Sequence, residues 1–148
     1  MNRKEEAISL FKDGFNCSQA VLSVFSDELS IDREMALKIA TGFGGGSRNG
    51  ELCGAVSGAL MVLGMKDGHF IKGDNDRKSR SYGLAKEFTD RFKEVQGDIV
   101  CKNLLGYDLS NPDEYKILDE KGLFMSECPK YIESAIEVLE SMLSSKNL

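Results

Sequence analysis

Four cysteines carry most of the chemistry that this sequence could perform. Cys17, Cys53, Cys101 and Cys128 are separated by intervals of 36, 48 and 27 residues, so no two of them form a Cys-x-x-Cys pair. This spacing excludes the local dithiol of thioredoxin-like proteins and the paired cysteines of a zinc ribbon. Any pair or cluster of these thiols must therefore be assembled by the tertiary fold.

Three of the four cysteines fall where the sequence predicts the start of a helix. Cys17 opens one helix, and Cys53 lies in the first turn of another. Cys128 precedes Pro129, which suits the first position of a helix, so Cys128 is expected to be an N-cap. The free N–H groups and the dipole at a helix start favour a thiolate, which is both a nucleophile and a metal ligand. We therefore expect an inward-facing cluster of acidic thiols, with Cys101 on a short helix as its fourth member.

Several interpretations of such a cluster remain open. Cys53 could attack a disulfide with Cys17 as its resolving partner, by thiol–disulfide exchange. All four thiolates could instead be the ligands of an iron–sulfur cluster or a zinc ion. A third interpretation assigns no chemistry to the cysteines. The protein is then a helical binding module with buried structural cysteines, because free cysteine is among the most often buried residues.

A glycine-rich loop at residues 42–50 precedes Cys53 and reads GFGGGSRNG. Its Gly-x-x-x-x-Gly spacing is followed by Glu-Leu where a P-loop needs Lys-Ser or Lys-Thr, so the phosphate and magnesium ligands are missing. We expect the loop to let backbone segments pack closely beside Cys53. Its free N–H groups could also bind a small anionic substrate or stabilise a thiolate. The candidate binding residues here are Gly45, Gly46, Arg48 and Gly54.

The cysteine pattern as a whole resembles a known family. The core Cys-Gly-Ala-x-x-Gly begins at Cys53, with an upstream cysteine in FNCSQAVL and later single cysteines in CKNLLG and ECPKYI. From about Phe15 to Ile136 the chain is similar to the redox-active family named after its C–GCAxxG–C–C pattern. The resemblance implies a redox role for the four cysteines and leaves the reaction unspecified.

Helical periodicity predicts an all-α fold, a multi-helix bundle that forms a single domain over residues 1–148. Its centre is an almost unbroken apolar run, expected to form a buried helix at about 52–65. That run is shorter than the about 20 residues that span a bilayer, so we expect no membrane insertion. Further helices are expected at 3–13, about 17–28, from Ser30 or Asp32 to about 41, and at about 76–96, 98–105, 112–121 and 129–144.

Composition limits the class of partner and the cellular compartment that we expect for this protein. The formal net charge of −5 argues against nucleic acid, because phosphate binding needs a basic surface. The opening MNRKEEAISLF turns acidic and amphipathic before an apolar segment forms, so no signal peptide is expected. We therefore expect a cytoplasmic protein, in which structural disulfides are uncommon. Its partner is expected to be a redox partner or a small anionic substrate, of an identity that the sequence does not give.

Overall fold

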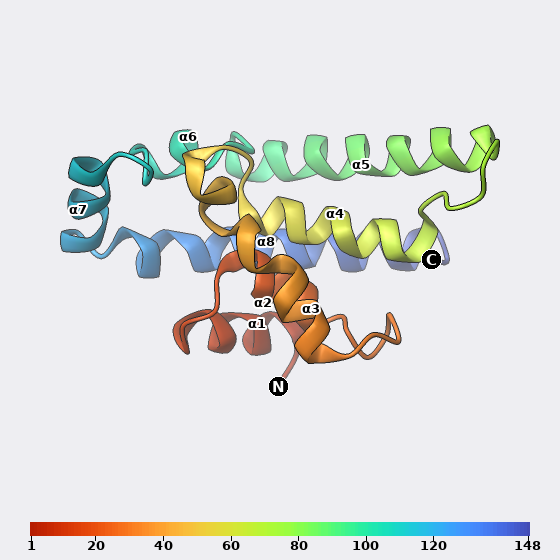
Figure 1. Cartoon of the computed structure of the whole chain (residues 1–148), viewed down its shortest axis with the longest axis horizontal. Coiled ribbons are helices and arrows are strands. Elements are labelled where there is room, and N and C mark those ends of the chain that lie inside the picture. The colour runs from red at the N-terminus through yellow and green to blue at the C-terminus, as the bar shows by residue number, and fades with distance from the viewer.

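A computed structural model describes all 148 residues as eight α-helices joined by turns, with no sheet (Figure 1). This confirms the all-α prediction. Three long helices, α4, α5 and α8, run along the longest dimension, α1 to α3 lie together on one side, and α6 and α7 lie toward one end (Figure 1). The helices are α1 (Arg3–Lys12), α2 (Cys17–Ser23), α3 (Arg33–Ala40), α4 (Gly54–Asp67), α5 (Asn75–Gln96), α6 (Cys101–Leu105), α7 (Pro112–Glu120) and α8 (Leu123–Ser145).

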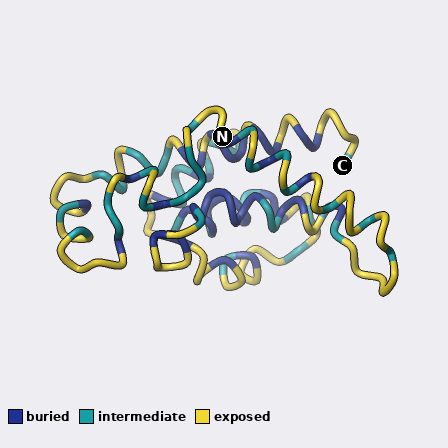
Figure 2. Tube along the Cα trace, turned by 90° about the horizontal axis from the view of Figure 1, so that it is seen from above, coloured by how far each residue is buried: buried dark blue, intermediate teal, exposed yellow.

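Helix α4 is the centre of the bundle, as its apolar sequence predicts. It packs against α2, α5 and α8, and every residue from Gly54 to Ala59 is buried. Figure 2 shows continuous buried backbone through the middle of the molecule, with exposed residues on the outer turns. The buried apolar side chains form one core around this helix. No helix in the structure combines the length and the apolarity needed to cross a membrane.

The start of α2 is fixed by a capping box. The Asn16 side chain accepts a hydrogen bond from the Gln19 N–H at 2.9 Å, and the Gln19 side chain accepts one from the Asn16 N–H at 2.9 Å. The Asn16 amide also donates to the carbonyl oxygen of Thr41 at 2.9 Å. The same residue therefore starts α2 at Cys17 and ties that start to the segment before the glycine-rich loop.

Three predicted helix boundaries are wrong by three residues or more. Helix α6 begins at Cys101 and not at residue 98, because Val100 pairs with Leu52 in an antiparallel bridge. Helix α2 ends at Ser23, and the chain continues as turns to Ser30, which has a positive φ of 56°. Helix α8 begins at Leu123, six residues before Pro129, so this proline lies inside a helix. Gly122 adopts a left-handed φ of 65° and ends the preceding turn, after which Leu123 can pack on the core. Leu123, Phe124 and Cys128 of this extra turn are partly buried against the core, and these contacts offset the backbone hydrogen bond that the proline removes.

A close approach between α2 and α4 sets the geometry of the cysteines. A Cβ atom added to Gly58 would lie 2.9 Å from the Ser18 carbonyl oxygen and 3.2 Å from Cβ of Val21. A Cβ atom added to Gly54 would lie 2.4 Å from Sγ of Cys17. Real Cβ atoms essentially never come as close as this last distance. Glycine at both positions therefore lets the start of α2 lie directly on the start of α4.

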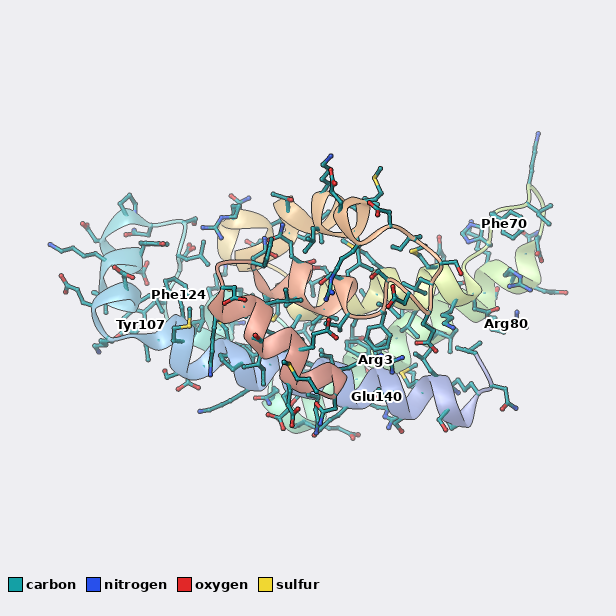
Figure 3. The ribbon with its side chains drawn as sticks, turned by 90° about the horizontal axis from the view of Figure 1, so that it is seen from below. Arg3, Phe70, Arg80, Tyr107, Phe124 and Glu140 are labelled. Atoms are coloured by element: carbon teal, nitrogen blue, oxygen red, sulfur yellow. The ribbon has the colours of Figure 1, made fainter.

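The far end of α4 is held by an ion-pair cluster. The buried carboxylate of Asp67 accepts hydrogen bonds from Arg77 at 2.7 Å and from Arg80 at 2.6 and 2.7 Å. Both arginines belong to α5, so the cluster ties the end of α4 to the start of α5. Figure 3 shows Arg80 near Phe70 at this end of the molecule, far from Phe124 at the start of α8.

The close approach of α2 and α4 predicts different effects for two glycine substitutions in α4. Gly58→Ala should destabilise the fold by about 1–3 kcal/mol, because the added methyl group overpacks against the backbone of Ser18. Gly64→Ala in the same helix is the matched control, because a Cβ there meets nothing within 4 Å. It should be neutral or stabilising by up to about 1 kcal/mol. Urea unfolding followed by circular dichroism measures both; equal effects of the two substitutions would argue against the close approach.

Candidate functional site

All four cysteines line one pocket of about 270 Å³, which we call the cysteine pocket. Gly45, Arg48 and Gly54 line the same pocket. Gly46 is buried beside it and does not line it. Most of the remaining wall is aromatic and aliphatic, including Phe124, which lies at the end of the molecule where α7 is found (Figure 3). The fold thus brings together thiols that lie far apart in the chain.

Three of the four thiols lie at helix starts, although not the three that the sequence predicts. Cys17 is the first residue of α2, Cys53 is the N-cap of α4, and Cys101 is the first residue of α6. Cys128 lies inside α8 because that helix begins five residues earlier. The prediction that Cys128 is an N-cap is therefore wrong. The first three thiols are buried and Cys128 is half-buried.

Cys53 and Cys101 are aligned by a short antiparallel bridge. Leu52 pairs with Val100, the Cys53 N–H donates to the Ile99 carbonyl oxygen at 2.8 Å, and the Cys101 N–H donates to the Glu51 carbonyl oxygen at 2.6 Å. Successive side chains alternate between the two faces of such a bridge. Cys53 and Cys101 therefore project together from the face opposite Leu52 and Val100. No sequence signal indicates this bridge.

The four thiols lie within electrostatic range of one another. The charge of Cys17 raises the pKa of Cys53, of Cys101 and of Cys128, and the charge of Cys101 raises the pKa of Cys53 and of Cys128. The Ala55 N–H, in the first turn of α4, faces the sulfur atoms of both Cys17 and Cys53.

Burial reverses the predicted acidity of the thiols. Desolvation is the largest effect on each cysteine and raises the pKa of Cys17 and of Cys128, raises that of Cys53 well above its ordinary value, and raises that of Cys101 to about 12. The Gly45 N–H of the glycine-rich loop and N–H groups at the helix starts lower the pKa of Cys17. N–H groups in the first turn of α4 lower that of Cys53, and the charge of Arg48 lowers that of Cys101. These opposing effects are smaller than desolvation, because the hydration energy that a buried thiolate loses exceeds the stabilisation that these contacts give it.

No three His, Cys, Asp or Glu side chains are grouped closely enough to hold one metal ion. The four cysteines thus share a pocket without forming the closed set of ligands that a structural zinc or iron–sulfur site requires. His69 is exposed and lies edge-on to Tyr82, away from the thiols.

The glycine-rich loop contains an unusual left-handed turn. Four consecutive residues, Gly45, Gly46, Ser47 and Arg48, have φ values of 64°, 62°, 55° and 63°. A Cβ atom on Gly46 would lie 2.2 Å from the Glu51 nitrogen, so glycine is required there. Non-glycine residues in this conformation store strain, which persists where the surrounding structure imposes it and is typical of functional sites. Sequence reasoning predicted close backbone packing here and missed the turn at Ser47 and Arg48.

Sequence reasoning also missed the aromatic part of the pocket. Phe11, Phe15, Tyr115 and Phe124 line it from α1, the following turn, α7 and α8. Helical spacing identifies Phe11 as an apolar residue of α1, but nothing local indicates that these rings share a wall with the cysteines.

The model of a family described as "Putative redox-active protein (C_GCAxxG_C_C)" matches residues 15–142. Neither the curated proteins nor the solved structures contain a match. The matched region includes all four cysteines and the glycine-rich loop.

The raised pKa values predict how the thiols respond to pH. Alkylation of native protein by iodoacetamide should rise about tenfold for each pH unit through pH 9 without levelling off, because the thiolate fraction keeps rising below the pKa. In denaturant the same cysteines should level off near about pH 9. Mass spectrometry of each labelled peptide separates the sites. A native plateau for Cys53 below about pH 8 would show that the helix start outweighs burial.

The strained turn predicts a stabilising substitution. Ser47→Gly should raise the free energy of unfolding by about 1 kcal/mol, since glycine adopts a positive φ without the steric penalty that serine pays. Ser79→Gly is the matched control, an exposed serine inside α5, and should lower stability by about 0.5–1 kcal/mol. Thermal unfolding of the two variants shows whether each substitution raises or lowers the stability of the fold. Destabilisation by both would contradict the left-handed assignment.

Proposed function

Because the family model covers most of its length, the chain belongs to the C_GCAxxG_C_C family, and we propose that it is a thiol-based redox protein. In this proposal Cys17 and Cys53 form a reversible dithiol–disulfide couple inside the cysteine pocket. Cys101 and Cys128 complete the same site.

The position of the Cys17 sulfur is the observation that carries this proposal. A Cβ atom on Gly54 would lie only 2.4 Å from this sulfur, so Cys17 lies directly against the residue that follows Cys53. Among ionisable groups, Cys17 has the largest effect in raising the pKa of Cys53. Cys101, by contrast, lies diagonally across the bridge from Cys53, where backbone separations of about 7–8 Å are typical and too long for a disulfide.

The couple would react by two exchange steps. The Cys53 thiolate attacks a substrate disulfide, forming a mixed disulfide and releasing one substrate thiolate. Cys17, after losing its proton to solvent, attacks the Cys53 sulfur, which forms the protein disulfide and releases the second substrate thiolate. Two protein thiols are oxidised and one substrate disulfide is reduced to two thiols. The protons that Cys53 and Cys17 release to solvent are balanced by the two that the product thiolates take up.

Burial determines which substrates this couple can serve. Because burial raises the pKa of both thiols, they are mostly protonated at neutral pH and resist unselective oxidation. The reaction therefore depends on a substrate that enters the pocket and reaches the sulfur atoms there. Four free cysteines fit a reducing compartment, and we propose a cytoplasmic location on that ground.

Titration in glutathione redox buffers tests the couple. The wild-type protein should show one two-electron transition, with peptide mapping that finds a Cys17–Cys53 disulfide. Cys53→Ser should abolish this transition while keeping the fold, because serine is a preferred N-cap residue at the start of α4. Cys128→Ser is the matched control and should leave the transition in place.

Two results would overturn the proposal. One is a transition that persists in the Cys53→Ser protein or a disulfide that joins another pair of cysteines. The other is bound iron or zinc in stoichiometric amount after anaerobic purification, together with loss of the glutathione-dependent transition. Metal analysis and visible absorption of the same preparation measure this second outcome.

A further inference from the structure

The wall of the cysteine pocket is mostly apolar and contains a single charged side chain. Its lining consists mainly of aromatic and aliphatic residues together with the four cysteines, and no aspartate or glutamate takes part. Arg48 is the only charged residue that lines it. A pocket of this composition selects for an apolar molecule and offers one ionic contact.

The left-handed turn directs Arg48 toward this pocket. Its Nη1 atom lies 2.6 Å from where a Cβ atom on Gly45 would be, so the guanidinium group folds back over that glycine. A side chain at position 45 would displace it. Gly45 therefore has a second role beyond its positive φ, since its missing side chain leaves room for the arginine.

The positive charge of Arg48 has no partner within the protein. The nearby carboxylate of Glu51 pairs with Lys102 at 3.2 Å. The carboxylate of Asp108 accepts hydrogen bonds from the Ser110 N–H at 2.9 Å and from the Ser110 hydroxyl at 2.6 Å. A guanidinium group offers a planar fork of donors that matches a carboxylate. An unpaired one at the wall of an apolar pocket is available to a ligand.

We propose that the cysteine pocket binds small apolar carboxylic acids, with Arg48 binding the carboxylate and the aromatic wall covering the apolar body. This inference rests on the proposed function and names its substrate class, a disulfide carried on an apolar carboxylic acid. The overall charge of −5 repels anions, so selection for an acid must come from this local contact. A volume of about 270 Å³ suits a small molecule and not a folded protein partner.

A matched pair of probes tests the inference. Lipoate carries a cyclic disulfide on an apolar chain that ends in a carboxylate, and lipoamide differs only in having a neutral amide there. With excess probe, the loss of protein thiols follows the exchange reaction. The wild-type protein should react with lipoate about tenfold faster than with lipoamide, the selectivity that a charge-assisted contact provides.

Two variants locate the source of this selectivity. Arg48→Asn removes the charge and keeps a residue that tolerates a positive φ, so the fold should be retained. It should bring the rate ratio of the two probes to about one while lipoamide still reacts. Lys102→Gln is the control, because it removes a nearby positive charge that does not line the pocket, and the ratio should stay within about twofold of the wild type.

The outcomes separate this inference from the redox couple. Equal rates for both probes in the wild type overturn the substrate class while the couple itself stands. A ratio that survives in Arg48→Asn, or that is lost in Lys102→Gln, also overturns it. If neither probe reacts, the pocket does not admit disulfides carried on apolar carboxylic acids and the inference fails. The glutathione titration tests the Cys17–Cys53 couple independently of this result.

Discussion

The close contact between the starts of α2 and α4 is the constraint on which the rest of the site depends. Two glycines of α4, Gly54 and Gly58, leave no side chain between the helices, so Cys17 lies against the first turn of α4 beside Cys53. The capping box at Asn16 fixes where α2 begins and therefore where this sulfur lies. A side chain on either glycine would separate the two helices and the two thiols together.

Two electrostatic effects compete at these thiols, and burial is the larger. Helix starts present N–H groups to Cys17 and Cys53, as expected for reactive cysteines, but desolvation raises every thiol pKa. A protonated, enclosed thiol is protected from general oxidants and still reacts with a disulfide delivered to it. In this protein, access to the pocket therefore matters more for selectivity than intrinsic acidity does.

The glycine-rich loop joins the cysteines to the rest of the pocket. Its left-handed turn stores backbone strain at Ser47 and Arg48 and places an unpaired guanidinium group over Gly45. Strain of this kind is retained when it positions a group that a relaxed backbone would place elsewhere. Thiols, an apolar wall and a single positive charge thus converge from segments far apart in the chain, although α4 alone forms the centre of the core.

Local sequence determined the helical class, the buried central helix, most helix starts and the four thiols, because periodicity, caps and glycine act over a few residues. Prediction from sequence failed where tertiary packing determines the structure. Helix α8 runs through Pro129 because Leu123 and Phe124 of the preceding turn pack against the core, which takes Cys128 away from a helix start. The bridge between Leu52 and Val100, the aromatic wall and the direction of the thiol pKa shifts also required the tertiary structure. Each of these depends on which distant segments pack together and exclude water. A short-range sequence pattern does not specify those contacts.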